Sequence, residues 1–387
     1  MKTKELGFST RLIHAGENPD QHGGAVITPI YQTSTFLYNG EDNENDLRYT
    51  RLSNSPTHES LHAKLARVEN GEDAVATSSG MSAISTTLLS FLKSGDHMMA
   101  QTKVYGGTFF FLTTDLPRLG ISHTFFDAGN PETWEQALTP QTKLLYVESM
   151  SNPILEIYDL EDIVAFAKKH DLLTVIDNTF ASPVNFNPLD LGFDVVVHSC
   201  TKYMNGHSDV IAGGIISSKK NIDIVKKKLG SMGGVLDPHA CFLLQRGMKT
   251  MALRVQRHNE NAMALATHLA KHTKVKKVYY PGLETSPSHS FAKKWFRGFG
   301  GMLSFELNAT KEQVCTFLKA LHLFAPAPSL GGVESLIICP AQTSHIAMCA
   351  DQKTRMGVCD TLIRISVGIE DIEDLIQDIE QAMEKIA

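Results

Sequence analysis

The chain of 387 residues has no long hydrophobic run. A helix that crosses a membrane needs about 20 consecutive apolar residues, and no stretch of the sequence approaches that length. The first residues, Met1 to Glu5, lead into polar sequence and not into the apolar core of a signal peptide. These absences argue against a membrane partner and predict a cytoplasmic protein.

Closely spaced cysteines are also absent. The six cysteines are never fewer than ten residues apart, so the chain has no Cys-x-x-Cys pair of the kind that binds zinc or exchanges disulfides. They are Cys200, Cys241, Cys315, Cys339, Cys349 and Cys359. We therefore expect reduced thiols, most of them buried, and no metal site built on cysteine.

The sequence contains no basic block either. Its formal net charge of -6 is spread over the whole length, and its 42% hydrophobic and 20% charged residues are typical of a soluble globular protein. Nucleic acids and anionic membranes are recognised by clustered positive charge. We therefore expect a small molecule as the binding partner, and no nucleic acid.

Three regions of the chain differ in pattern. Residues 1–60 have little periodicity and many turn formers, which predicts an N-terminal arm that drapes over the domain or reaches the neighbouring subunit. Residues 61–247 are expected to form a large domain and residues 248–387 a smaller C-terminal α/β domain. With 387 residues, the chain is long enough for both.

In the large domain, short apolar runs alternate with amphipathic helical segments. The runs cover residues 74–77, 97–100, 121–126, 143–148, 172–177, 195–198 and 211–216. This alternation is typical of an α/β fold with a mostly parallel sheet that is covered on both faces. Such folds carry their chemistry at the carboxyl ends of the strands, where Glu148, Asp177 and Ser199 fall.

The pattern changes after a helical region at about residues 240–272. Fewer apolar runs follow, and helical segments separate them or close the chain. The runs cover residues 275–279, 302–307 and 362–367, and the helical segments about 311–321 and 371–386. This part of the sequence predicts the smaller domain.

The segment Ser199-Cys200-Thr201-Lys202 directly follows one apolar strand, and Asp177 ends another. A lysine can hold an aldehyde covalently, hydroxyl groups can bind a phosphate, and an acid can hold a protonated pyridine nitrogen. The combination predicts a cofactor that carries all three groups. The alternative is a lysine that simply leaves a strand end for solvent.

The segment Ser78–Ile84 follows the first strand and opens a helical run. Small residues at such a turn let backbone N–H groups approach a phosphate, although a plain helix start has the same composition. In the arm, Tyr49 and Arg51 flank Thr50, and the guanidinium could complete this phosphate site from this or another subunit.

Tyr105 follows the second strand and precedes Gly106 and Gly107. We expect the glycines to make a tight turn that leaves the tyrosine above the strand ends. There its phenol could stack on a cofactor ring and exchange protons. A packed tyrosine in a surface turn is the alternative.

Asn152 and Arg364 are candidates for binding a substrate carboxylate. Asn152 lies in the loop after the strand at 143–148, and Arg364 is flanked by apolar residues inside a strand pattern. An arginine is costly to bury unless it is paired, and an amino-acid carboxylate is a natural bidentate partner. A structural salt bridge would explain Arg364 as well.

The segment His58-Glu59-Ser60-Leu61-His62 matches the His-Glu-x-x-His pattern of zinc metallopeptidases. Ser55 and Pro56 supply a helix start, which would place both imidazoles on one helical face. No third ligand can be recognised downstream. A zinc metallopeptidase is therefore kept only as an alternative of a different class, and we expect no metal.

Together these motifs resemble the Cys/Met-metabolism family of enzymes that depend on pyridoxal 5'-phosphate (PLP). That family contains the cystathionine γ-synthases, the cystathionine β- and γ-lyases, and methionine γ-lyase. The resemblance runs almost end to end, through Thr10–Gly16, Thr28–Tyr31, Val175–Phe180, Ser199–Asp209 and Leu362–Gly368. It implies fold type I, a PLP cofactor, and a homotetramer made of paired active-site dimers.

The resemblance also implies roles for single residues. Lys202 would form the covalent bond to the cofactor aldehyde, Asp177 would hold the pyridinium proton, and Tyr105 would stack on the ring. Lys202 would later shuttle protons at the substrate, and Tyr105 would accept the proton of the incoming amine or protonate the departing sulfur.

The remaining implied residues bind the phosphate and the substrate carboxylate. The phosphate would be bound by Gly80, Met81, Ser199 and Thr201, with Tyr49 and Arg51 added across the dimer interface. The carboxylate would be held by Asn152, Ser329 and Arg364.

The sequence departs from the family pattern at four places. Pro328 stands where members that act on cystathionine at Cγ typically carry a glutamate. One bacterial β-lyase group instead has a tyrosine there and a tryptophan at the place of Leu330. Methionine γ-lyases usually have a cysteine in place of Gly107, and Asn54–Thr57 holds one residue more than the usual Asn-Pro-Thr.

We therefore predict a PLP-dependent carbon–sulfur lyase of transsulfuration that cleaves cystathionine, with β-elimination ahead of γ-elimination because of Pro328. β-Elimination yields homocysteine, pyruvate and ammonia, whereas γ-elimination yields cysteine, 2-oxobutyrate and ammonia. The alternatives are γ-replacement, as in cystathionine γ-synthase or O-acylhomoserine sulfhydrylase, and methionine γ-lyase. The expected metabolic setting is methionine biosynthesis and cysteine metabolism.

Overall fold

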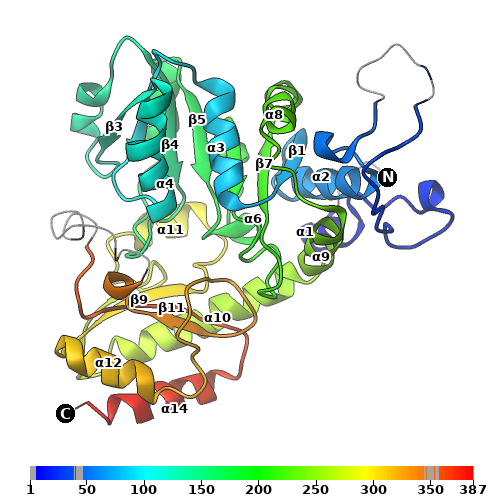
Figure 1. The fold of residues 1–387 in the computed structure, drawn as a ribbon. Helices are drawn as coiled ribbons and strands as arrows, with labels where there is room; N and C mark the ends of the chain where they lie inside the picture. The colour runs from blue at the N-terminus through cyan, green and yellow to red at the C-terminus, as the bar shows by residue number, and fades with distance from the viewer. Residues whose placement is uncertain are drawn as a thin grey trace.

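The computed structural model describes residues 6–38, 40, 47–343, 346, 353 and 357–386. They form two lobes, each built around its own sheet (Figure 1). The larger lobe lies above in this view, and the C-terminus lies at the foot of the smaller one. Both lobes combine helices with a sheet, which is the predicted α/β class.

The larger lobe contains a seven-stranded sheet in the order β1-β7-β6-β5-β4-β2-β3. Its strands are β1 (Asp73–Thr77), β2 (His97–Gln101), β3 (Ser122–Phe126), β4 (Thr142–Glu148), β5 (Leu173–Asp177), β6 (Val195–His198) and β7 (Gly213–Ser217). β3, β2, β4, β5 and β6 pair in parallel, and β7 runs antiparallel to β6 and β1. The prediction of a mostly parallel sheet is therefore confirmed.

Helices cover both faces of this sheet. The helices up to the end of this lobe are α1 (Phe8–His14), α2 (Pro56–Val68), α3 (Gly80–Phe91), α4 (Gly106–Phe110), α5 (Leu160–Lys169), α6 (Ser182–Asn185), α7 (Pro188–Leu191), α8 (Lys219–Met232) and α9 (Pro238–Met248). Val195 and Val197 of β6 share a core with α3 and α8, whereas Val196 shares another with α2 and α5. Because strand residues alternate between faces, burial on both sides produces the continuous apolar runs of the sequence.

The smaller lobe contains an antiparallel sheet in the order β10-β11-β9-β8. Its elements are α10 (Met251–Leu269), β8 (Val275–Tyr279), α11 (His289–Trp295), β9 (Met302–Leu307), α12 (Lys311–Ala320), β10 (Leu336–Ile338), β11 (Leu362–Ser366) and α14 (Ile372–Met383). Leu303 and Phe305 of β9 share a core with α10, α12 and α14. Ser304, between them, donates a hydrogen bond of 2.6 Å to the Pro153 carbonyl. One face of the small sheet thus carries the helices, and the other faces the larger lobe.

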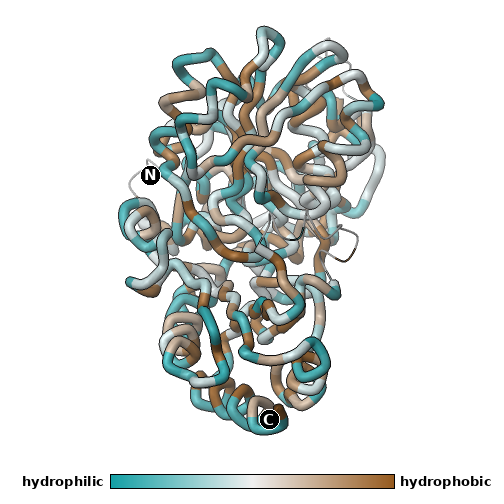
Figure 2. The backbone as a smooth tube through the Cα atoms, turned by 90° about the vertical axis from the view of Figure 1, so that its left-hand side faces the viewer, coloured by the Kyte–Doolittle hydropathy of each residue, from teal (hydrophilic) through white to brown (hydrophobic). Residues whose placement is uncertain are grey.

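The hydropathy of the chain follows this layering. Figure 2 shows hydrophobic segments running through the middle of the larger lobe, with hydrophilic segments at its outer loops. Within the described ranges, no helix combines the length and the apolar character that a membrane crossing requires.

Two local predictions were wrong. Gly106 and Gly107 do not make a tight turn but begin helix α4, whose first turn is closed by the Phe109 N–H donating to the Tyr105 carbonyl at 2.9 Å. The strand expected from residue 211 starts only at Gly213. Ala212 instead exchanges hydrogen bonds with Thr201, which lies in the turn after β6.

Other elements were merged or missed. The single helical region expected at 240–272 is two helices, α9 and α10, and strand β10 was not expected. Residues 1–60 contain α1 and the start of α2. Leu12 of α1 is buried in the core of this chain, whereas the Leu37 side chain is 96% exposed. The N-terminal region is therefore anchored at one end, and its reach to a neighbouring subunit stays a prediction.

Candidate active site

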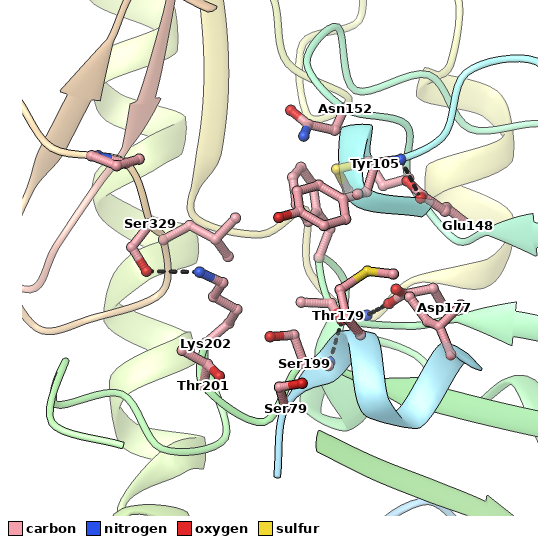
Figure 3. Close-up of a pocket in the computed structure, with 18 of the residues that line it drawn as sticks. Ser79, Tyr105, Glu148, Asn152, Asp177, Thr179, Ser199, Thr201, Lys202 and Ser329 are labelled. Carbon is pink, nitrogen blue, oxygen red and sulfur yellow. Dashed lines mark hydrogen bonds between the residues drawn. The ribbon is translucent and has the colours of Figure 1, made fainter. Parts of the chain in front are cut away.

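A pocket of about 450 Å³ opens where the carboxyl ends of β4, β5 and β6 face the smaller lobe (Figure 3). This volume suits a small cofactor or substrate. The structure brings together in its lining these predicted site residues: Gly80, Met81, Tyr105, Asn152, Asp177, Ser199, Thr201, Lys202, Ser329 and Arg364. They come from both lobes and from segments far apart in the sequence.

Lys202 lies in a tight turn directly after β6, and its side chain reaches into the pocket (Figure 3). Its Nζ donates a hydrogen bond of 2.8 Å to Ser329 Oγ. Burial, and then the neighbouring charge of Arg364, lower the pKa of Lys202 to about 8. A lysine with this pKa presents much more neutral amine at physiological pH than a surface lysine does.

The N-terminus of α3 and the turn after β6 form a narrow cradle. Ser79 caps α3 by accepting a hydrogen bond of 3.0 Å from the Ser82 N–H, and the first N–H groups of a helix have no intrahelical partner. A Cβ added to Gly80 would lie 2.7 Å from Ser199 Cβ, so only glycine allows this approach. The cradle therefore offers backbone N–H groups and the Ser199 hydroxyl to an anion.

Thr201 also lines the pocket, but its hydroxyl is engaged. Thr201 Oγ1 donates to the Ala212 carbonyl at 3.1 Å and accepts from the Ala212 N–H at 3.0 Å. Binding a phosphate through this hydroxyl would require the hydrogen bond to the carbonyl to be exchanged.

Asp177 ends β5 at the base of the pocket. Its Oδ1 accepts a hydrogen bond of 2.9 Å from the Thr179 N–H, and burial raises its pKa. No lysine or arginine of the described chain pairs with it. The Asp177 side chain is half-buried, and hydrogen bonds from Thr179 and the nearby charge of His198 oppose the effect of burial on its pKa. Its carboxylate is suited to a cationic ligand group such as a protonated ring nitrogen.

Tyr105 stands at the edge of the pocket, opposite Lys202 (Figure 3). The side chain is 46% exposed. A Cβ added to Gly107 would lie 2.6 Å from Tyr105 Cε1 and 3.0 Å from Met81 Sδ, so the ring packs closely against this glycine. Helix α4 and not a turn thus presents the phenol to the pocket.

Arg364 of β11 is buried, and no acidic side chain of the described residues pairs with it. Its Nη1 donates to Asn152 Oδ1 at 2.9 Å and its Nη2 to the Ser329 carbonyl at 3.3 Å, whereas its Nε has no partner in the part of the chain that the structure describes. Burial lowers its pKa to about 10. The alternative of a structural salt bridge is therefore not supported, and a donor remains available for a ligand carboxylate.

Tyr49 and Arg51 lie outside the pocket of this chain. Arg51 Nη1 donates to the Gly230 carbonyl at 2.6 Å, and its guanidinium lies 5.5 Å from the centre of the Tyr49 ring. Their predicted role across a dimer interface is not tested by a single chain and stays a prediction.

The two histidines of the zinc pattern lie on α2 and are buried. His58 Nδ1 is bonded to Ser55 Oγ and Nε2 to the Leu236 carbonyl, each at 2.7 Å, so neither ring nitrogen is available to a metal. Glu59 is bonded to Arg48 at 3.0 Å. In the part of the chain that the structure describes, no group of three or more potential ligands could hold a metal ion. The peptidase alternative is therefore not supported.

Sequence reasoning missed two polar residues near the pocket. Glu148 lines it and accepts a hydrogen bond from the Tyr105 N–H, although only its place at a strand end had been noted. Arg254 of α10 is buried and donates to the Tyr203 carbonyl at 2.9 Å and the Gly247 carbonyl at 2.8 Å, which braces the turn after Lys202. Nothing in the helical pattern around Arg254 indicated this contact.

Comparison with known proteins finds relatives along the whole chain. The chain is 44% identical to an L-methionine γ-lyase of Fusobacterium nucleatum subsp. polymorphum, covering 100% of both chains. It is 44% identical to a cystathionine γ-lyase of Bacillus subtilis, covering 97% of this chain and 99% of the relative. It is also 44% identical to a cystathionine β-lyase of Lactococcus lactis subsp. cremoris, covering 98% and 99%.

Solved structures show the same architecture. The crystal structure of cystathionine γ-lyase from Lactobacillus plantarum, complexed with L-serine, matches with a TM-score of 0.94 at 40% identity. The match covers 98% of this chain and 99% of that chain. The predicted fold type I is therefore confirmed.

The residues of the pocket fit PLP. Lys202 can hold its aldehyde, the cradle at Gly80 and Ser199 its phosphate, and the Asp177 carboxylate its ring nitrogen. The family model described as "Cys/Met metabolism PLP-dependent enzyme" matches residues 9–384. This chain therefore belongs to the Cys/Met-metabolism family of PLP-dependent enzymes.

Proposed function

We propose that this protein is a carbon–sulfur lyase that cleaves cystathionine. The observation that carries the proposal is the position of Lys202 Nζ in the pocket. Arg364 lies on the same side of the pocket as Lys202, and Asp177 lies on the opposite side. An amino acid bound there has its carboxylate near a buried guanidinium and its Cα near a lysine. The relatives named as cystathionine lyases support this choice of substrate.

Arg364 and Asn152 bind the substrate carboxylate in this proposal. The Nε of Arg364 has no partner in the described chain, and Asn152 Oδ1 already orients the guanidinium. Ser329 links the two functions because its carbonyl accepts from Arg364 and its hydroxyl accepts from Lys202. The carboxylate and the reacting carbon are thereby held in a defined relation.

Lys202 moves the proton at Cα. When bound, PLP supplies an electron sink for the pair that remains as that proton leaves. With PLP bound, the Lys202 amine would be the group placed to accept the Cα proton, and its pKa, lowered from 10.5 to about 8, leaves more of the neutral amine that this transfer needs. Tyr105 is the residue placed to exchange a proton with the substrate amine or with the departing sulfur.

We place β-elimination ahead of γ-elimination, on the argument from Pro328. Pro328 lines the pocket next to Ser329 and offers no carboxylate to a distal ammonium group. The carboxylates that line the pocket are Glu148 and Asp177, both on the larger lobe. The relatives carry both β-lyase and γ-lyase names, so this order rests on Pro328 alone.

The test is to incubate the purified holoenzyme with cystathionine and identify the keto acid. Pyruvate is the expected product and indicates β-elimination. If 2-oxobutyrate is the main product, the reaction is γ-elimination and the preference for β-elimination is wrong. If neither keto acid forms, an O-acylhomoserine with a thiol is tested next, and its conversion would assign γ-replacement in place of elimination.

Methionine γ-lyase is the second candidate function. Apolar side chains, including Met81, Met150, Phe180 and Leu330, line much of the pocket and suit a thioether without a distal charge. The relative from Fusobacterium nucleatum carries this name. Comparing kcat/KM for methionine and for cystathionine decides between the two, and a larger value for methionine would favour this candidate.

We further propose that the arm of one subunit completes the site of its neighbour in a cytoplasmic homotetramer. Tyr49 and Arg51 lie outside the pocket of their own chain, and Val26 and Leu37 of the arm are 80% and 96% exposed. The test mixes Arg51→Ala chains with Lys202→Ala chains under conditions of subunit exchange. Each mixed dimer then holds one site with both residues intact, so turnover should reappear, and its continued absence would contradict a shared site.

A further inference from the structure

We propose that Glu148 is a positioning residue that fixes Tyr105 over the cofactor pocket, with Gln101 completing the connection. The inference rests on the role proposed for Tyr105 against the cofactor ring. Its central observation is the hydrogen bond of 2.6 Å from the Tyr105 N–H to Glu148 Oε1 (Figure 3). Glu148 lines the pocket, and through this contact it can act on Tyr105 without touching the substrate.

Gln101 and Glu148 are the last residues of the neighbouring strands β2 and β4. The Glu148 N–H donates to Gln101 Oε1 at 3.1 Å, and Gln101 Nε2 donates to the Lys103 carbonyl at 2.6 Å. Together with the bond to Tyr105, these contacts fasten the crossing from β2 to α4 at two points. Gln101 is only 1% exposed, so water competes little for its hydrogen bonds.

The Tyr105 backbone is held from both sides. Its N–H donates to Glu148, and its carbonyl accepts from the Phe109 N–H in the first turn of α4. The side chain is 46% exposed and packs on one side against Gly107. Packing alone therefore leaves one face of the Tyr105 ring open. The backbone hydrogen bonds then fix the position of that face relative to the pocket.

The environment of Glu148 indicates which substitutions should preserve its hydrogen bond to Tyr105 and which should remove it. Glu148 is 6% exposed and pairs in register with Asp177 on β5, and burial together with the Asp177 charge raises its pKa. A neutral carboxyl still offers an oxygen to the Tyr105 N–H. Glutamine offers the same acceptor without a charge, whereas alanine removes the acceptor from the half-buried N–H.

The test measures the holoenzyme without substrate, with two readouts of the bound cofactor. One is the visible circular dichroism of the PLP band, and the other is the PLP dissociation constant from equilibrium dialysis. The variants are Glu148→Ala, Glu148→Gln, Tyr105→Ala and the double variant Glu148→Ala/Tyr105→Ala. Glu132→Ala, which removes an exposed carboxylate, is the matched control.

We expect Glu148→Ala to weaken PLP binding about tenfold and to reduce the dichroic band, as the loss of one buried hydrogen bond would. Glu148→Gln should stay within about twofold of the parent, because the acceptor remains. In the Tyr105→Ala background, Glu148→Ala should add less than about twofold, because there is no ring to position. Glu132→Ala should change neither readout.

Two results would overturn the inference. A full tenfold effect of Glu148→Ala in the Tyr105→Ala background would mean that Glu148 acts through Asp177 or through general stability. A normal band in Glu148→Ala, alongside a changed one in Tyr105→Ala, would mean that Tyr105 needs no such support. Both readouts are taken without substrate, so a wrong choice of substrate in the proposed function would leave them unchanged.

Discussion

The two sides of the pocket carry basic and acidic side chains, buried or half-buried, and no hydrogen bond or ion pair joins the two sides among the described residues. On the cationic side, burial lowers the pKa of Lys202 to about 8 and that of Arg364 to about 10. On the acidic side, burial raises the pKa of Glu148 and of Asp177. Figure 3 shows Lys202 and Ser329 across an open space from Asp177 and Glu148.

The acidic side comes from the larger lobe alone, whereas the cationic side combines residues of both lobes. Glu148 and Asp177 end adjacent strands of the large sheet, whereas Arg364 comes from β11 of the smaller lobe and Lys202 from the turn that faces it. A direct salt bridge between a basic and an acidic side chain across the pocket would occupy the space that a ligand needs. Because the charges stay apart, a ligand with an anionic end and a protonated ring nitrogen can satisfy both sides.

Replacing Lys202 should produce the largest effect on the cationic side. Lys202→Ala removes the only lysine that lines the pocket among the described residues, and we expect kcat/KM for cystathionine to fall by about a thousandfold or more. Borohydride should bleach the yellow colour of the parent enzyme and fix PLP covalently to it. The same treatment should leave no PLP covalently attached to Lys202→Ala. Lys220→Ala, on the exposed start of α8, is the control, and retained turnover in Lys202→Ala would contradict the mechanism.

Replacing Arg364 should affect substrate binding more than the chemical step. Arg364→Gln keeps a polar side chain but removes the charge that faces the carboxylate, so we expect kcat/KM to fall about 100-fold, mostly through KM. Steady-state kinetics measure this split. Arg257→Gln on the exposed face of α10 should leave both constants unchanged. A loss confined to kcat would instead assign Arg364 to the chemical step.

The lowered pKa of Lys202 should appear in the pH dependence of stability of the protein without cofactor. Between the folded pKa of about 8 and the ordinary value of 10.5, only the unfolded chain keeps this proton. The free energy of unfolding contributed by Lys202 should therefore rise with pH across that window. Urea unfolding of the parent and of Lys202→Met measures it: the parent should gain on the variant between pH 8 and 10.5. A constant difference would mean an unshifted lysine.

The smallest effect is expected away from both sides of the pocket. Asp159 caps α5 by accepting hydrogen bonds from the Glu161 and Asp162 N–H groups at 3.1 and 3.3 Å. Asp159→Ala should lower the free energy of unfolding by about 1 kcal/mol without changing kcat/KM. Denaturant unfolding and kinetics on the same preparation check this. A change in kcat/KM would show that a residue outside the pocket also influences its basic and acidic side chains.

Much of the larger lobe could be predicted because its signals are local. Apolar runs of four to six residues mark strands β1 to β6, and Ser55 with Pro56 marks the start of α2. The prediction erred at Gly106 and Ala212, where contacts with other segments decided the outcome. A glycine pair is compatible with a turn or a helix start, and in the helix observed here Gly107 packs against Tyr105 and Met81.

The candidate site was predicted mainly through family motifs and strand ends. These placed Lys202, Asp177 and Gly80 at the pocket, as the structure has them. They did not indicate that Thr201 already bonds to Ala212 or that Glu148 holds Tyr105. Such contacts depend on side-chain geometry between neighbouring segments, which a linear pattern does not encode.

The sequence by itself determined the family, the alternation of strands and helices, and the lysine that follows β6. These features depend on residue types within a few positions of one another. Only the tertiary structure decided that Lys202 meets Ser329, 127 residues away, and that Arg364 is buried with no acidic partner among the described residues. Those contacts exist because the smaller lobe packs against the strand ends of the larger one, and the charges of the pocket take their separation from that packing.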